Sequence, residues 1–87
     1  MATTKVTSVT DGDTFVGTGN IVYRLEGVDT PERGKPDCQK AKGYLTKLID
    51  GKTVSTVVKA TDKYGRKIVQ VTYGGASINK KVKDQFG

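Results

Sequence analysis

Hydrophobic and polar side chains alternate over short stretches in the first third of the chain. These stretches are rich in Thr, Val, Ile, Phe and Tyr and are separated by the turn-forming sequences DGD and GTGN. In the last of them, Tyr23 and Leu25 flank the polar Arg24, so a strand there has two chemically different faces. The pattern predicts β-strands over residues 4–10, 14–18 and 20–28.

A helical period replaces this alternation after the sequence RGKPD. Apolar residues then recur at a spacing of three or four, and Asp50-Gly51 supplies a glycine that can end a helix in the left-handed conformation. The spacing predicts one helix from Asp37 to the glycine, with the sole cysteine as a small apolar residue on it. Its apolar positions are Cys38, Ala41, Tyr44, Leu45, Leu48 and Ile49.

Two further strands are predicted over residues 52–60 and 66–73, followed by a tight turn at Gly-Gly. Asn79 is a suitable N-cap for a short last helix, on which Val82 and Phe86 can pack inward. Five strands with a helix between the third and fourth are typical of an OB-type β-barrel. We therefore expect an α+β fold in one domain over residues 1–87.

Composition restricts the chemistry. The chain has 15 Lys and Arg against 9 Asp and Glu, a formal net charge of +6, which favours a polyanionic partner such as nucleic acid over a merely solvated basic surface. It has no histidine, which excludes histidine-based nucleophilic triads, zinc sites with imidazole ligands and histidine acid–base pairs. One cysteine excludes an internal disulfide. Any catalysis must therefore use carboxylates, arginines, tyrosines or a metal bound by oxygen ligands.

Targeting signals are not predicted. The first ten residues, MATTKVTSVT, contain neither a basic segment nor a long apolar run, and no stretch is apolar enough to span a membrane. We expect a protein without membrane contact, cytoplasmic unless a leader was removed.

Acidic and basic residues gather in three short sequences, DGDT at 11–14, RLEGVDTPER at 24–33 and DKYGR at 62–66. Each by itself is explained by a turn or a strand exit. Together they supply carboxylates and two arginines in a basic chain, which are the groups that metal-assisted cleavage of a phosphodiester requires.

The three sequences, in this order and with a helix between the second and third, resemble the staphylococcal nuclease family. The resemblance extends over most of residues 6–86, including the INKKVKDQFG segment. It implies a Ca²⁺-dependent, sugar-nonspecific endonuclease that hydrolyses DNA and RNA, with single strands preferred, and leaves 3′-phosphates.

The resemblance also implies a role for individual residues. Asp13, Asp29 and the carbonyl of Thr30 would bind Ca²⁺, and Asp11 would orient these ligands. Glu32 would act as general base or orient the attacking water, Arg24 and Arg66 would clamp the scissile phosphate, and Lys63 and Tyr64 would contact a terminal phosphate of the substrate.

Two other functions stay open: a nucleic-acid-binding module of the same fold without catalysis, and an interaction protein with an exposed apolar patch. The family usually continues into a further helix that this sequence lacks. We therefore expect Val82 and Phe86 to be left uncovered, giving a marginally stable monomer or a weak homodimer.

Overall fold

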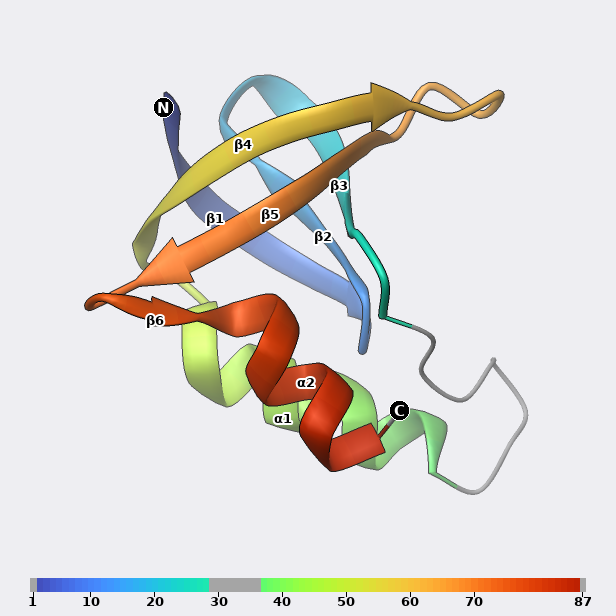
Figure 1. The fold of residues 1–87 in the computed structure, drawn as a ribbon, viewed down its shortest axis with the longest axis vertical. Helices are drawn as coiled ribbons and strands as arrows, with labels where there is room; N and C mark the ends of the chain where they lie inside the picture. The colour runs from blue at the N-terminus through green and yellow to red at the C-terminus, as the bar shows by residue number, and fades with distance from the viewer. Residues whose placement is uncertain (1, 29–36, 87) are drawn as a thin grey trace.

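The computed structural model describes residues 2–28 and 37–86. Figure 1 shows a curved sheet closed into a barrel, with two helices side by side below one end of it. The elements in chain order are β1 (Ala2–Asp11), β2 (Thr14–Gly17), the 3-10 helix η1 (Thr18–Asn20), β3 (Ile21–Leu25), α1 (Cys38–Ile49), β4 (Thr53–Thr61), β5 (Lys67–Tyr73), β6 (Ala76–Ser77) and α2 (Ile78–Phe86).

The strands are ordered β3-β2-β1-β4-β5-β6, and neighbours in this order are antiparallel. A parallel pairing of β3 with β5 closes β1 to β5 into a barrel, and the short β6 extends from β5. The α+β class and the five-stranded OB-type barrel predicted from the sequence are confirmed.

The barrel is filled by the inward side chains of the strands and closed below by the helices. Phe15 and Tyr23 stack inside it with their ring centroids 5.1 Å apart. The hydrophobic core consists of Val6, Phe15, Tyr23, Leu25, Val28, Leu45, Ile49, Val54, Val69, Val71, Ile78 and Val82.

Helix α1 follows the predicted spacing. Its buried residues are Cys38, Ala41, Leu45 and Ile49, so one stripe faces the barrel, and the cysteine is free and buried as expected. Asp50 is the C-cap, and Gly51 after it has a φ of 72°, which confirms the predicted glycine ending.

Helix α2 differs from the expectation in two respects. Asn79 is not the N-cap, because the helix begins one residue earlier and the Ser77 hydroxyl accepts the backbone N–H of Lys80 at 3.2 Å. Val82 is fully buried, and Phe86 packs edge-on against Tyr44 at 5.6 Å. The prediction that these two apolar residues would be left uncovered is therefore wrong.

Strand β3 ends at Leu25, three residues before the predicted boundary. The backbone N–H of Glu26 still donates to Val69 on β5, but Gly27 has a φ of 73° and turns the chain out of the sheet. The chain thus leaves the sheet at Gly27, directly before Val28.

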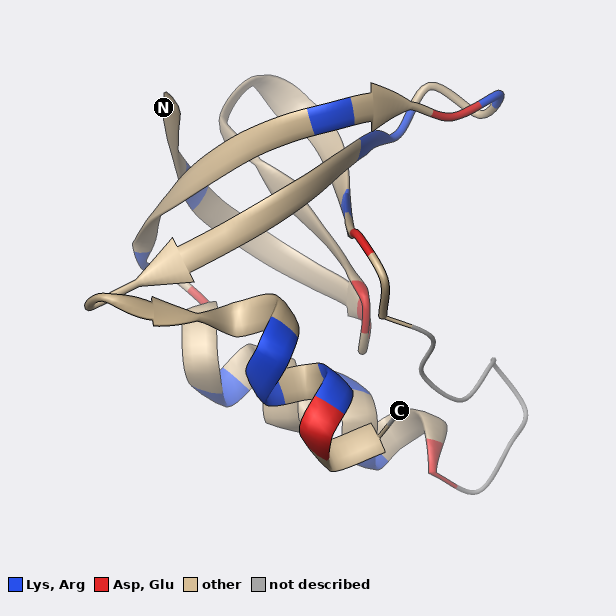
Figure 2. Cartoon of the chain, viewed as in Figure 1, with Lys and Arg blue, Asp and Glu red and all other residues tan. Residues whose placement is uncertain are grey.

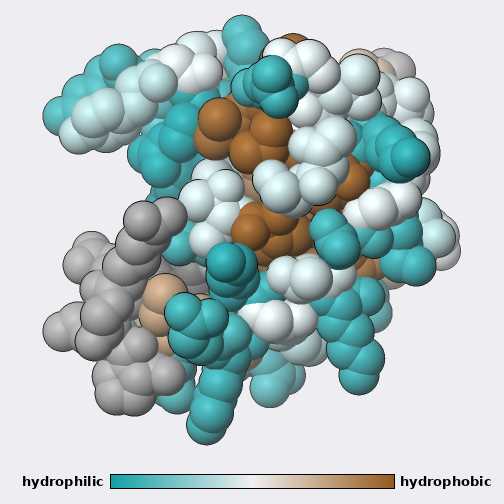
Figure 3. All heavy atoms as spheres, turned by 180° about the vertical axis from the view of Figure 1, so that it is seen from behind, coloured by the Kyte–Doolittle hydropathy of each residue, from teal (hydrophilic) through white to brown (hydrophobic). Residues whose placement is uncertain are grey.

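Hydrophobic side chains also reach the surface. On the rear face they form patches between hydrophilic residues (Figure 3). The large hydrophobic residues that are exposed are Ile21, Val57, Val58, Tyr64 and Tyr73. Among the described residues no helix is long and apolar enough to cross a membrane.

Candidate functional site

The turn between β1 and β2 places a carboxylate against an arginine of β3. Thr14 pairs with Arg24 across the two strands, and the backbone N–H of Leu25 donates to the carbonyl of Asp13 at 2.8 Å. Arg24 and Asp13 thus form an ion pair, with Nη2 and Oδ2 3.3 Å apart. Thr14 Oγ1 donates to the other carboxylate oxygen of Asp13 at 2.9 Å, which fixes the carboxylate plane.

Arg24 is held from a second direction. Its Nη2 also donates to the carbonyl of Val28 at 3.5 Å, just beyond the turn that ends β3. The side chain is 30% exposed and that of Asp13 14% exposed, so the pair lies partly shielded at the barrel end. A partly desolvated pair is less screened by salt than a surface pair.

The turn between β4 and β5 is organised by the carboxylate of Asp62. Its Oδ1 accepts the backbone N–H groups of Tyr64 and Arg66 at 3.0 and 2.9 Å. Its Oδ2 accepts Nε of Arg66 at 2.6 Å, and Gly65 adopts a φ of 82° to close the turn. One carboxylate therefore fixes both the backbone of the turn and the direction of the arginine.

These contacts shift the titration of Asp62. Loss of hydration alone would raise its pKa, but the hydrogen bonds from the backbone and side chain of Arg66 and from the backbone of Tyr64 outweigh this effect. With the positive charge of Arg66 they hold the pKa of Asp62 below its usual range. Asp62 thus stays ionised as a partner of the guanidinium at neutral pH.

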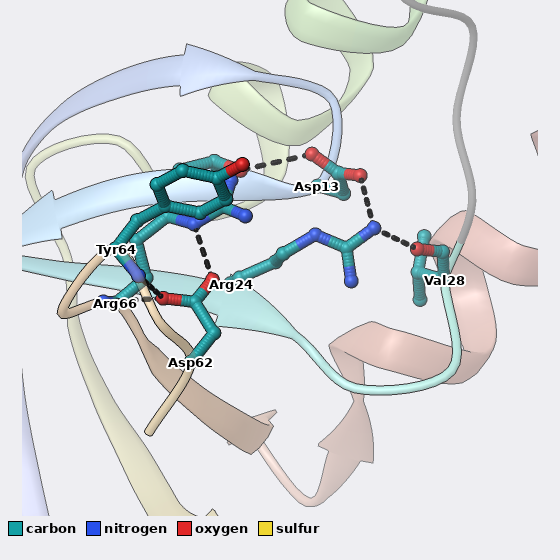
Figure 4. A network of polar contacts seen from close by, with 7 residues as sticks. Asp13, Arg24, Val28, Asp62, Tyr64 and Arg66 are labelled. Carbon is teal, nitrogen blue, oxygen red and sulfur yellow. Dashed lines mark hydrogen bonds and ion pairs between the residues drawn. The ribbon is translucent and has the colours of Figure 1, made fainter. Parts of the chain in front are cut away.

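Barrel closure brings the two arginines together across 42 positions of sequence. The parallel pairing joins Tyr23 to Lys67 and Arg24 to Ile68, so the turn that ends at Arg66 opens beside Arg24. Figure 4 shows both arginines at one end of the barrel, each with its own carboxylate.

Both guanidinium groups retain donors for a ligand. Within residues 2–28 and 37–86, Arg24 engages only Nη2, and Arg66 engages only Nε, in hydrogen bonds. Next to Arg66 the ring of Tyr64 is 72% exposed, with the Arg66 guanidinium 5.3 Å and the Lys63 ammonium 5.2 Å from its centroid. This arrangement suits an anionic group with an aromatic attachment.

Three of the predicted residues, Asp29, Thr30 and Glu32, lie outside the described part of the chain. Asp11 is the last residue of β1 and lies opposite Thr14. In the part that the structure describes, no three carboxylate, cysteine or histidine side chains form a cluster able to hold a metal. The described site therefore contains one of the expected metal ligands, Asp13.

Two partners of the arginines were not predicted from the sequence. Asp62 begins the DKYGR segment, and an aspartate that opens a turn with a glycine is a recognisable sign of side chain to backbone hydrogen bonds. The carbonyl of Val28 gives no comparable sign, because a backbone acceptor is independent of residue type.

Figure 2 shows basic residues on both helices and around the β4–β5 turn, and acidic residues at the β1–β2 turn and the exit of β3. The site can therefore attract a polyanion through the net charge of +6 and bind one phosphate through two oriented arginines.

Comparison with known proteins shows that the chain is similar to nucleases of one family. A model of the staphylococcal nuclease homologue family matches residues 22–85. An uncharacterised endonuclease of Haemophilus influenzae is 33% identical over 87 aligned residues, which cover 95% of this chain and 49% of that protein. A probable staphylococcal-like nuclease of Oryza sativa subsp. japonica is 32% identical over 59 residues, 68% of this chain and 18% of that protein. The chain thus spans about half the length of the first relative and less of the second.

Proposed function

Because this chain belongs to the staphylococcal nuclease family, we propose that it is a Ca²⁺-dependent nuclease that hydrolyses phosphodiester bonds. The observation that carries the proposal is the pair of arginines, each aligned by a carboxylate and each with guanidinium donors that are unused within residues 2–28 and 37–86. A binding module needs positive charge, but not two arginines held in fixed directions at one point.

In this proposal the two arginines bind the non-bridging oxygens of the scissile phosphate. Asp62 fixes Nε of Arg66, and within the described residues its two Nη groups make no hydrogen bond, so they can form a planar fork for phosphate oxygens. Arg24, braced by Asp13 and the Val28 carbonyl, supplies the second positive charge. Oriented donors of this kind stabilise charge that grows in the transition state without further reorganisation.

Glu32 is the proposed group that orients or deprotonates the attacking water. It follows β3 by seven residues and lies outside the described residues, so this role rests on the family resemblance. A carboxylate is a suitable base here because the chain contains no histidine.

The residues present fit an oxygen-ligated cation. Among the described residues each carboxylate oxygen of Asp13 has one partner, which leaves lone pairs for a metal. With the Asp29 carboxylate and the Thr30 carbonyl, it would make the all-oxygen donor set that Ca²⁺ prefers. When bound, such a cation polarises the phosphoryl group.

The proposed substrates are DNA and RNA, with single strands preferred and 3′-phosphates as products. The exposed ring of Tyr64 can stack on an unpaired base, and Lys63 can meet a terminal phosphate. Base stacking and a phosphate contact do not depend on the 2′-hydroxyl, so this mode of binding supports a nuclease that is not specific for the sugar.

The deciding experiment is digestion of a labelled single-stranded DNA in Ca²⁺ or in excess EGTA. We expect cleavage only with Ca²⁺, poor replacement by Mg²⁺, and a loss of about 10²-fold or more in turnover for Arg66→Gly and for Glu32→Ser. As matched controls, Lys40→Gln and Lys42→Gln on α1 should alter mainly the salt dependence of binding.

Full activity in EGTA would contradict the metal assignment. Equal losses in all four variants would show that general electrostatics, and not two placed groups, support the activity. Binding without cleavage in any metal would favour the non-catalytic nucleic-acid-binding module.

A further inference from the structure

A groove lies between the exit of β3 and the first turns of α2. It has a volume of about 310 Å³, close to the lower limit for small-molecule sites in proteins. Its walls come from Glu26 and Gly27 after β3, Gln70 on β5, and the start of α2. Ser77 at the end of β6 and the α2 residues Asn79, Lys80 and Lys83 complete the lining.

The floor of the groove is rigidly built. The side chain of Asn79 is 5% exposed; it accepts the Val71 N–H at 2.8 Å and donates to the carbonyls of Glu26 and Val69 at 2.9 and 3.0 Å. Gln70 Nε2 donates to Glu26 Oε1 at 2.8 Å, which orients the carboxylate. Helix α2 is thereby fixed at a set distance from the β3 exit.

The α2 wall of the groove is positively charged. Lys80 and Lys83 stand one turn apart on the helix, and within the described residues neither ammonium lies within 4 Å of a carboxylate, although Glu26 lines the same groove. The first turn of α2 contains no acidic residue, so the positive end of the helix dipole adds to Lys80. Repulsion between these neighbouring positive charges destabilises the free protein slightly, and a bound anion would relieve it.

The groove begins two residues after Arg24 along the chain. Arg24 and Glu26 are two residues apart on β3 and its exit, about 7 Å along an extended chain. Gly27 is followed directly by Val28, whose carbonyl accepts from Arg24. A polyanion held at Arg24 can therefore extend into the groove without crossing the barrel.

We infer that this groove is a second phosphate-binding subsite, in which Lys80 and Lys83 contact a phosphate one or two nucleotides away from the bond held by the arginines. The inference rests on the proposed function, because it takes the ligand to be nucleic acid. Two sources of phosphate fit the chemistry: the backbone of a substrate strand and a free nucleotide. A free nucleotide would reach the groove independently of Arg24, whereas a strand would need both sites.

The test compares Lys80→Gln/Lys83→Gln with Lys47→Gln/Lys81→Gln, which removes the same charge from exposed lysines outside the groove. Binding of a fluorescent 20-nucleotide single-stranded DNA is measured by anisotropy in EGTA across a salt series, and binding of deoxyadenosine 5′-monophosphate by NMR titration. We expect the groove variant to weaken DNA binding roughly five- to twentyfold. We also expect it to reduce the salt slope by about 0.7 per lost phosphate contact, more than the control does.

Selective weakening for the 20-nucleotide strand supports a backbone subsite, and equal weakening for the mononucleotide supports a free-nucleotide subsite. Groove and control variants that bind both ligands alike would overturn the inference and leave a solvated basic helix. Binding in EGTA does not depend on cleavage, so an inactive protein that still distinguishes the two variants would refute the proposed nuclease function and not the subsite. Melting temperatures of both variants verify that each is folded.

Discussion

Replacing Asn79 with alanine should strongly destabilise the domain, because its amide makes three hydrogen bonds that tie α2 to β5 and to the exit of β3. Alanine would leave the buried N–H of Val71 and the carbonyl of Glu26 without their partner, whereas the Val69 carbonyl keeps the N–H of Glu26 at 2.9 Å. Each buried polar group left unpaired costs about 1–3 kcal/mol, so we expect a loss of roughly 2–4 kcal/mol. In a domain of 87 residues that corresponds to a fall of roughly 10–25 °C in melting temperature.

The assay is urea unfolding followed by circular dichroism, with thermal unfolding as a second measurement. Gln85→Ala on the exposed side of α2 is the matched control and should change the unfolding free energy by less than about 0.5 kcal/mol. Because Asn79 also supports the β3 exit beside Arg24, the variant should lose nuclease activity at temperatures where it is still folded. A free energy of unfolding for Asn79→Ala within about 0.5 kcal/mol of the parent protein would refute the reasoning.

Three further variants test other contacts. Gly17→Ala should cost about 1–3 kcal/mol in thermal unfolding, because its Cβ would lie 2.7 Å from the ring of Tyr23, whereas Gly43→Ala in α1 meets no atom within 4 Å and should stabilise the helix slightly. Asp62→Asn should lower turnover about tenfold or more by releasing the side chain of Arg66, and an unchanged rate would show that the arginine needs no anchor. Because the pKa of Asp62 is lowered in the folded state, the stability that its ionised form contributes is complete above the ordinary pKa of 3.8. This stability is lost as the pH falls through the folded-state pKa. The free energy of unfolding, measured by urea unfolding at several acidic pH values, should therefore depend less on pH in Asp62→Asn than in the parent protein.

The sequence predicted most elements because their periodicity is local. Alternation placed Tyr23 inside the barrel and Arg24 outside it, and the helical period found the buried stripe of α1. It did not predict the outcome for Asn79, since asparagine suits both an N-cap and a buried clamp, and only the tertiary position of Val71 and Glu26 decides between them.

The relative position of Arg24 and Arg66 in space could not be predicted from local sequence patterns either. It depends on the parallel pairing of β3 with β5, which no local pattern in the sequence indicates. The family resemblance supplied only the expectation that Arg24 and Arg66 act on one phosphate. Asp62 was part of a recognised cluster, but its hydrogen bonds to Arg66 became visible only when the turn was built.

The two arginines are held by different means, and this difference follows from where they lie. Arg24 stands on a strand whose backbone is fixed by neighbours on both sides, so one ion pair to Asp13 and one carbonyl suffice to set its direction. Arg66 ends an exposed turn with no such support, and Asp62 compensates with three hydrogen bonds that order the turn and the side chain together. Ordering before the ligand arrives removes an entropy cost from binding and from the transition state. A small barrel can therefore orient two arginines through one strand and one short turn, as the proposed binding of a phosphate requires.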